Sequence, residues 1–131
     1  MKGKSIFKSL QALLLCCMLL FVFTGCFGTK SYSFEKTAKN GDTFRGTFEL
    51  DFSTNVPTYV YYGHDIDALC DLGNISAAIG IYGEIEKSGY LYDCGETRNG
   101  KSKYMPSGMD YYLWVSEDES YVSYGGYKFT K

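Results

Sequence analysis

The stretch TFRGTFELDF, residues 43–52, alternates apolar and polar side chains along its whole length. One face carries aromatic or aliphatic side chains and one glycine, namely Phe44, Gly46, Phe48, Leu50 and Phe52. The other face carries charged or hydroxyl side chains. A period of two is typical of a β-strand with one buried face, so we predict a half-buried strand over these residues.

The residues before this strand predict its first partner. Asn40-Gly41 is the dipeptide most typical of a two-residue hairpin turn, and it stands between residues 31–38 and 43–52. We therefore predict that these two segments pair as a hairpin.

The rest of the chain continues in short alternating segments. Residues 58–63, 110–116 and 121–131 predict strands, the last with a bulge at Gly125-Gly126, and residues 74–87 and 88–95 predict a hairpin that turns at 87–89. Residues 95–109 predict a long loop, with a hairpin turn at Asn99-Gly100. Residues 65–72 are the exception, because their apolar spacing predicts one or two helical turns.

Short strands at this regular spacing predict an all-β fold. With such short connections, six to eight strands favour a small antiparallel meander barrel or sandwich over parallel crossovers. No repeat or composition shift divides residues 31–131, so we expect one β-domain there.

The first thirty residues have the three parts of an export signal. Lysines open the chain, residues 10–23 form an apolar run of about fourteen residues, and small residues follow. A membrane-spanning helix needs about twenty residues, so the run is too short to span. The residues Phe23-Thr24-Gly25-Cys26 resemble the lipobox of bacterial lipoproteins, although Phe23 stands where leucine is most frequent.

This resemblance implies cleavage of residues 1–25, acylation of the Cys26 thiol and a short tether at residues 26–30. The domain would then be anchored to a membrane through lipid on the extracytoplasmic side of a bacterial envelope. Because Phe27 rather than aspartate follows the anchor cysteine, we expect the outer membrane where one is present.

The charge of the mature chain limits its partners. Removing residues 1–25 lowers the basic residues from thirteen to ten and keeps all fifteen acidic residues, a net charge near −5. This disfavours nucleic acid and anionic lipid headgroups, which need clustered cations, and is compatible with a cationic protein partner.

Two cysteines of the mature domain, Cys70 and Cys94, predict a disulfide, because exported domains usually pair their thiols. A zinc site is disfavoured, since zinc prefers four ligands and the chain has one histidine, His64. We predict no cofactor, no metal ligand and no catalytic residue.

The acidic stretch after His64 leaves an alternative open. Asp65, Asp67 and Asp71 could present carboxylates to calcium or to acid–base chemistry, but the stretch lacks a calcium-loop signature. We expect a capped, solvated turn instead.

Aromatic residues supply the main functional prediction. They make up 18% of the chain, and in several segments both faces of the predicted strand are aromatic. One face must then expose rings with polar tips, as protein interfaces do, unless the tyrosines serve only strand stability. The candidate binding residues on the less obviously buried face are Tyr62, Tyr112, Trp114 and Tyr124.

Ser107 is a further candidate. Ser107-Gly108, followed by Tyr111 and Trp114, is similar to a signature of lipoprotein inhibitors of C-type lysozyme. That resemblance implies a small anchored β-barrel whose loop serine enters a cationic enzyme.

The sequence thus predicts a non-enzymatic binding or inhibitory module that acts through aromatic strand faces and the segment near residues 95–109. Two alternatives stay open: a lipocalin-like barrel for a small apolar ligand, and a calcium or acid–base site at Asp65, Asp67 and Asp71.

Overall fold

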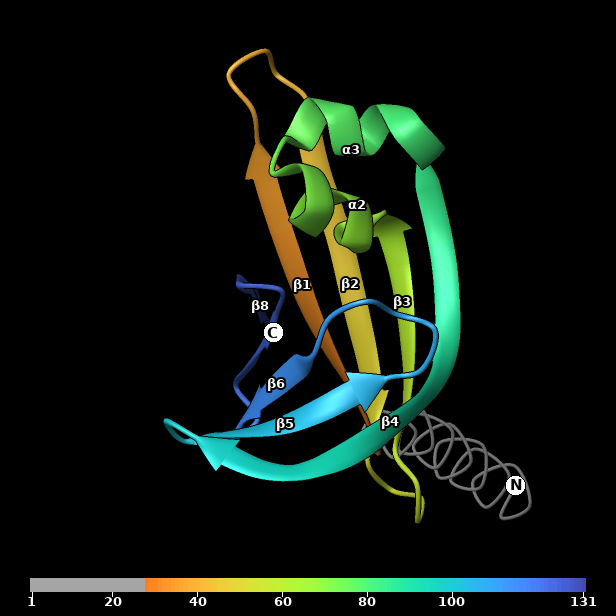
Figure 1. Ribbon diagram of the computed structural model, residues 1–131, viewed down its shortest axis with the longest axis vertical. Coiled ribbons are helices and arrows are strands. Elements are labelled where there is room, and N and C mark those ends of the chain that lie inside the picture. Colours follow the sequence, from red (N-terminus) through yellow and green to blue (C-terminus); the bar gives the residue numbers. More distant parts are fainter. Residues whose placement is uncertain (1–27) are drawn as a thin grey trace, which may run out of the picture.

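The computed structural model describes residues 28–131, so the predicted signal, the lipobox and Cys26 lie outside the described residues. Eight antiparallel strands in chain order form a closed barrel (Figure 1). The strands are β1 (Thr29–Thr37), β2 (Thr43–Asp51), β3 (Thr58–His64), β4 (Glu84–Arg98), β5 (Lys101–Pro106), β6 (Leu113–Ser116), β7 (Tyr121–Tyr124) and β8 (Tyr127–Thr130). The predicted all-β meander is therefore confirmed as a barrel.

The opening hairpin forms as its sequence predicts. β1 and β2 pair over their full length, from Thr37 opposite Thr43 to Thr29 opposite Asp51. Gly41 has a φ of 93°, which glycine adopts without the steric cost of a side chain. The barrel closes between β1 and β8, where Ser33 lies opposite Thr130.

Two short helices, α2 (Ile66–Leu72) and α3 (Ile75–Tyr82), connect β3 to β4 and cover one end of the barrel (Figure 1). α2 confirms the predicted helical turns, with Asp65 as its N-cap and Gly73 in the left-handed conformation at its end. In the described part of the chain, no helix is long and apolar enough to cross a membrane.

α3 corrects the strand that we predicted at residues 74–87. Asn74 has extended backbone angles, and its side chain accepts a hydrogen bond from the Ala77 N–H, as an N-cap does. The chain becomes a strand only at Glu84, so the predicted turn at 87–89 is part of β4.

Two other boundaries also differ from the prediction. Most of the predicted loop at 95–109 belongs to β4 and β5, which are joined at the expected Asn99-Gly100 turn. Gly125 and Gly126 form a turn between β7 and β8 rather than a bulge in one strand.

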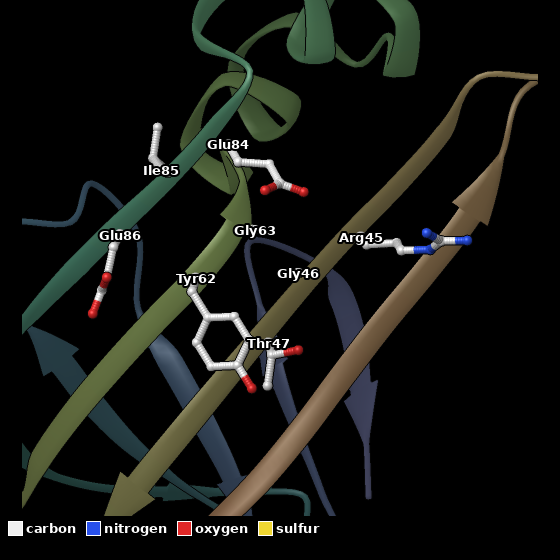
Figure 2. Close-up of a pocket in the computed structure, with 8 residues that line it drawn as sticks. All are labelled: Arg45, Gly46, Thr47, Tyr62, Gly63, Glu84, Ile85 and Glu86. Atoms are coloured by element: carbon white, nitrogen blue, oxygen red, sulfur yellow. The ribbon is translucent and has the colours of Figure 1, made fainter.

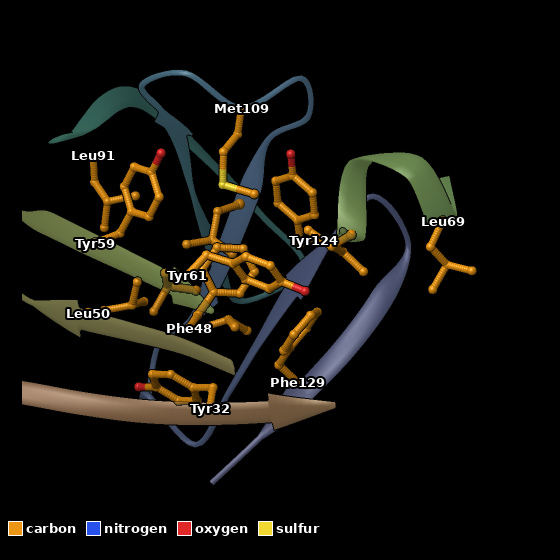
Figure 3. Packing of buried hydrophobic residues seen from close by; sticks show 14 of the residues in the cluster. Tyr32, Phe48, Leu50, Tyr59, Tyr61, Leu69, Leu91, Met109, Tyr124 and Phe129 are labelled. Atoms are coloured by element: carbon orange, nitrogen blue, oxygen red, sulfur yellow. The ribbon is translucent and has the colours of Figure 1, made fainter. Parts of the chain in front are cut away.

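Aromatic rings fill the barrel interior (Figure 3). The ring of Phe48 lies at the centre, with its centroid 4.9 Å from that of Tyr61, 5.4 Å from that of Tyr124 and 5.0 Å from that of Phe129. All four side chains are fully buried. The barrel therefore has a packed core, as expected when about eight strands enclose side chains of this size.

The predicted disulfide is absent, and Cys70 and Cys94 are both free thiols. Cys70 lies on α2, where its Sγ is 3.9 Å from the carbonyl oxygen of Gly125. Cys94 is exposed on β4, where its Sγ is 3.8 Å from the carbonyl oxygen of Tyr92. The two thiols thus lie in different environments: Cys70 is close to the β7–β8 turn, and Cys94 is on the barrel surface.

Candidate functional site

The predicted aromatic residues do not form one surface. Tyr62 is 43% exposed on β3, and Tyr112 is 48% exposed just before β6. Trp114 is half-buried on β6. Since β4 and β5 separate β3 from β6 in the barrel, these side chains belong to two outer walls.

Tyr124 corrects the prediction, because it is fully buried. Its hydroxyl donates a hydrogen bond to the Asp67 carboxylate and accepts one from the Tyr111 N–H at 3.1 Å. Burial is the main cause that raises the pKa of Tyr124, and the hydrogen bond to Asp67 adds to it. Tyr124 therefore joins α2 to the barrel core and is not available to a partner.

Ser107 also has an internal role. Its hydroxyl oxygen accepts a hydrogen bond from the Tyr90 N–H at 2.9 Å, and its own N–H donates to the Tyr90 carbonyl at 2.9 Å. The Ser107 carbonyl accepts a hydrogen bond from the Tyr59 hydroxyl. These bonds connect the segment after β5 to β4, and Ser107 is half-buried there.

The acidic residues of α2 have separate structural partners. Asp65 caps the helix by accepting from the Ala68 N–H at 3.2 Å, and the Tyr111 hydroxyl donates to Asp71. Asp67 is buried beside Tyr124, and Lys87 Nζ lies 3.5 Å from its Oδ2. Among residues 28–131, no group of three or more His, Cys, Asp or Glu side chains is placed to hold a metal ion. The expected capped turn is present, although Asp65 and Asp67 are buried rather than solvated.

A cleft of about 530 Å³ lies on the outer wall formed by β2, β3 and β4 (Figure 2). We call it the Tyr62 cleft; its lining residues are Arg45, Gly46, Thr47, Tyr62, Gly63, Glu84, Ile85 and Glu86. Two neighbouring rows of outward positions border the cleft. Thr47, Tyr62 and Glu86 lie side by side across the three strands and form one row. Glu84 and its partner His64 belong to the next row. The hollow therefore lies between neighbouring rows of side chains.

His64 explains why this hollow is open. Its Nδ1 accepts a hydrogen bond from the Arg45 N–H at 2.9 Å, and its ring centroid lies 5.4 Å from that of Phe44, a core residue. The ring is thus turned against the barrel and does not line the cleft. The place between Arg45 and Glu84 that an outward side chain would fill is left vacant.

A glycine pair shapes the floor of the Tyr62 cleft. Gly46 and Gly63 lie opposite each other in the β2–β3 ladder. A Cβ at Gly46 would overlap the Tyr61 hydroxyl, and one at Gly63, whose φ is 127°, would overlap the Arg45 carbonyl oxygen. Only glycine fits both positions without a shift of the neighbouring atoms.

The Tyr62 cleft is acidic. Glu84 and Glu86 have no ion-pair partner among the described residues. Figure 2 shows Arg45 pointing away from them toward β1, where its Nε is 3.2 Å from Glu35 Oε2. The Tyr62 ring extends over Thr47, and its hydroxyl is 3.3 Å from Glu49 Oε1. The cleft thus offers carboxylates and an aromatic ring, while its one cation is already paired.

The second outer wall, formed by β4 to β7, has the opposite character. The Lys103 ammonium lies 4.0 Å from the centroid of the Tyr112 ring and 5.6 Å from that of Trp114. Glu96 accepts from Lys103 at 3.0 Å and from Arg98 at 2.7 Å. The hydrogen bond from Lys103 is the main cause that lowers the pKa of Glu96. Sequence reasoning found Tyr112 and Trp114 but missed these cations, because the strands that bring them together lie in a segment that reads as a loop.

Sequence reasoning also missed the Tyr62 cleft, apart from Tyr62 itself. Glu84 and Glu86 stand in the segment assigned to a different hairpin, and the orientation of His64 has no sequence signal. Comparison with known proteins adds no homologue: no protein-family model, no curated protein and no solved structure matches this chain.

Proposed function

We propose that this chain is a non-enzymatic, envelope-anchored binding module that captures a cationic protein partner through its β2–β3–β4 wall. Acylation of Cys26 holds the barrel at the membrane in this proposal. The observation that carries the binding role is the Tyr62 cleft, in which Glu84 and Glu86 lie without ion-pair partners among residues 28–131 beside an exposed tyrosine.

The chemistry of the cleft favours a guanidinium or ammonium group. A carboxylate binds such a group by charge-assisted hydrogen bonds, which are stronger than neutral ones. The face of the Tyr62 ring attracts the same groups electrostatically. A lysine or arginine side chain of a partner therefore meets complementary groups on both sides of the cleft, and the net negative charge of the mature chain adds long-range attraction.

Two alternative functions have less support. A lipocalin-like barrel needs an interior cavity, whereas aromatic rings pack the centre of this barrel. A calcium or acid–base site needs convergent carboxylates, whereas Asp65, Asp67 and Asp71 bind three different groups of the protein.

The test uses the full chain in detergent micelles, titrated with an arginine-rich peptide and, separately, with an acidic peptide of equal length. We expect saturable binding of the basic peptide only, weakened by added salt. The double variant Glu84→Gln/Glu86→Gln should bind at least about ten-fold more weakly, since two lost charge-assisted contacts of roughly 1 kcal/mol each exceed the ~1.4 kcal/mol of a ten-fold change.

A matched control separates the cleft from overall charge. The double variant Asp93→Asn/Glu117→Gln removes the same number of negative charges at exposed positions outside the cleft lining. It should bind the basic peptide with near wild-type affinity. If both double variants lose affinity for the basic peptide equally, binding depends on net charge alone. That result would contradict the proposed role of the Tyr62 cleft.

A further inference from the structure

A second, smaller hollow of about 270 Å³ lies on the second outer wall, which β4 to β7 form. We call it the Trp114 pocket; its lining residues are Arg98, Asn99, Lys101, Trp114, Ser123 and Gly126. They come from the end of β4, the β4–β5 turn and the start of β5, from β6, and from β7 with the turn that follows it. The pocket shares no residue with the Tyr62 cleft.

The Trp114 ring, with two cations close to it, forms one side of the pocket. The Arg98 guanidinium carbon lies 5.6 Å from the centroid of the Trp114 ring, as does the Lys103 ammonium. Both cations are also bonded to Glu96, which fixes them relative to the ring. Trp114 is half-buried, so one part of the ring is packed while another part is left to the solvent.

Cations outnumber carboxylates around this ring. Three basic side chains lie at the pocket: Arg98 and Lys101 line it, and Lys103 lies over Trp114. Two acidic side chains belong to the same region, Glu96 and Glu117, whose N–H donates to the Gly100 carbonyl at 2.9 Å. The local charge is therefore positive on a mature chain whose total is negative.

We propose that the Trp114 pocket binds an anionic sugar residue of a saccharide. The flat indole ring offers a stacking surface for the apolar face of a pyranose. Arg98 and Lys101 supply charge-assisted hydrogen bonds to a phosphate or carboxylate on that sugar. Asn99 and Ser123 supply neutral polar groups for hydroxyls, the combination of a ring and a few polar groups that small-ligand sites use.

The size of the pocket favours a sugar over a longer binding groove. At about 270 Å³ it is slightly smaller than typical sites for drug-sized molecules, which start at about 300 Å³. One pyranose with its anionic substituent is a ligand of that scale. The phosphate and the carboxylate are two sources of the same charge, so the experiment treats them separately.

Trp114 is the single tryptophan of the chain, and its fluorescence therefore reports on this pocket alone. The full chain in detergent micelles is titrated with three oligosaccharides of equal length, one phosphorylated, one containing uronic acid and one neutral. We expect a saturable change in tryptophan emission with at least one anionic oligosaccharide and none with the neutral one. The anionic arm that responds identifies the source of the charge.

Two double variants test the assignment. Arg98→Gln/Lys101→Gln should weaken the binding of the anionic oligosaccharide about ten-fold, as expected when charge-assisted hydrogen bonds are lost. Lys36→Gln/Lys39→Gln removes the same charge near the β1–β2 turn, away from the pocket lining, and should leave the affinity unchanged. Calorimetry repeats both titrations without relying on fluorescence.

Three results would overturn the proposal. The first is the absence of any saturable signal by fluorescence and calorimetry while circular dichroism shows the native fold. The second is equal binding of neutral and anionic oligosaccharides. The third is tighter binding of an acidic peptide than of any saccharide, which would assign the pocket to proteins. The basic-peptide titration tests the Tyr62 cleft, which shares no lining residue with the Trp114 pocket. Its outcome is therefore independent of the oligosaccharide titrations.

Discussion

The Tyr124 hydroxyl of β7 donates a hydrogen bond to the Asp67 carboxylate of α2, across 57 residues of sequence. Both groups are buried, and Lys87 of β4 completes the cluster with its Nζ 3.5 Å from Asp67 Oδ2. A helix, a long strand and a short strand thus meet at one carboxylate. This contact attaches the helical end of the molecule to the barrel.

The first prediction concerns this bond. Tyr124→Phe removes the hydroxyl that serves both Asp67 and the Tyr111 N–H. Leaving a buried carboxylate short of a donor costs roughly 1–3 kcal/mol, so we expect a lower free energy of unfolding by about 2 kcal/mol. Urea denaturation measures it. Tyr121→Phe, on a partly exposed side chain of the same strand, is the control and should change stability little.

The second prediction concerns pH. Burial is the main cause that raises the pKa of Asp67 above its usual 3.8, despite the opposing hydrogen bond from Tyr124 and the charge of Lys87. The folded protein therefore holds this proton more tightly than the unfolded chain. Its contribution to stability is present below the unfolded pKa and is lost as pH rises through the raised folded pKa.

Asp67→Asn isolates that contribution, because asparagine does not titrate and its amide oxygen can still accept from Tyr124. We expect the wild-type free energy of unfolding, minus that of the variant, to fall as pH rises above 3.8 and through the raised folded pKa of Asp67. Urea titrations at a series of pH values provide the difference. A difference that rises with pH would mean that the Lys87 charge outweighs burial.

The third prediction concerns Gly89 and Ser107. A Cβ at Gly89 would overlap the Ser107 hydroxyl oxygen. The absence of a side chain at Gly89 therefore leaves room for the hydrogen bond from the Tyr90 N–H to that oxygen. Gly89→Ala should destabilise the protein by about 1–3 kcal/mol, the range for overpacking. In a Ser107→Ala background the overlapping oxygen is gone, and the same change should cost clearly less.

A double-mutant cycle by thermal or urea unfolding measures this coupling. Additive effects of the two substitutions would show that the strand shifts to accommodate the new methyl group. In that case, the close approach of Gly89 and Ser107 has no energetic consequence.

The fourth prediction concerns the thiols. Burial is the main cause that raises the pKa of Cys70 to about 12, whereas Cys94 is exposed. Since the thiolate is the reactive form, an alkylating reagent near pH 8 should label Cys94 rapidly and Cys70 only upon unfolding. Peptide mapping by mass spectrometry distinguishes them from the other cysteines. Protection of both, with a mass lower by two hydrogens, would instead establish the disulfide that the sequence predicts.

The sequence predicts the first half of the barrel well, for a physical reason. In β2 one face is apolar throughout, and a shift by one residue would expose it, so the alternation specifies both the strand and its register. The Asn40-Gly41 turn then fixes the partner. Local signals and long-range packing agree there.

The error at α3 arises where these signals conflict. Ile75, Ala77, Ile79 and Ile81 alternate as in a strand, yet Asn74 and Gly83 provide the caps of a helix. A short apolar run fits either periodicity, and only the contact of this segment with the end of the barrel decides it. Ala78, which interrupts the alternation, is the residue of α3 that is fully buried.

The candidate site is harder to predict than the fold. Both faces of β7 contain aromatic residues, and the partner of the inward Tyr124 hydroxyl, Asp67, is distant in sequence. The alternation also restarts after the Gly125-Gly126 turn, so Phe129 and the partly buried Tyr127 face the core as Tyr124 does, whereas an unbroken alternation would place them on the opposite face. The Tyr62 cleft depends on which way a single histidine turns, and periodicity carries no information about that.

The position of α3 has a consequence for the membrane anchoring that we propose. Asn40 Nδ2 donates to Ser76 Oγ at 2.8 Å, so α3 lies at the β1–β2 turn, while β1 begins at the other end with Thr29. Nine extended residues span roughly 30 Å. Under the proposed acylation of Cys26, three residues before Thr29, the lipid would lie at the end of the barrel opposite to the exposed Ile81 and Tyr82 of α3. The acidic and basic walls would then face sideways, available to two different molecules along the same surface.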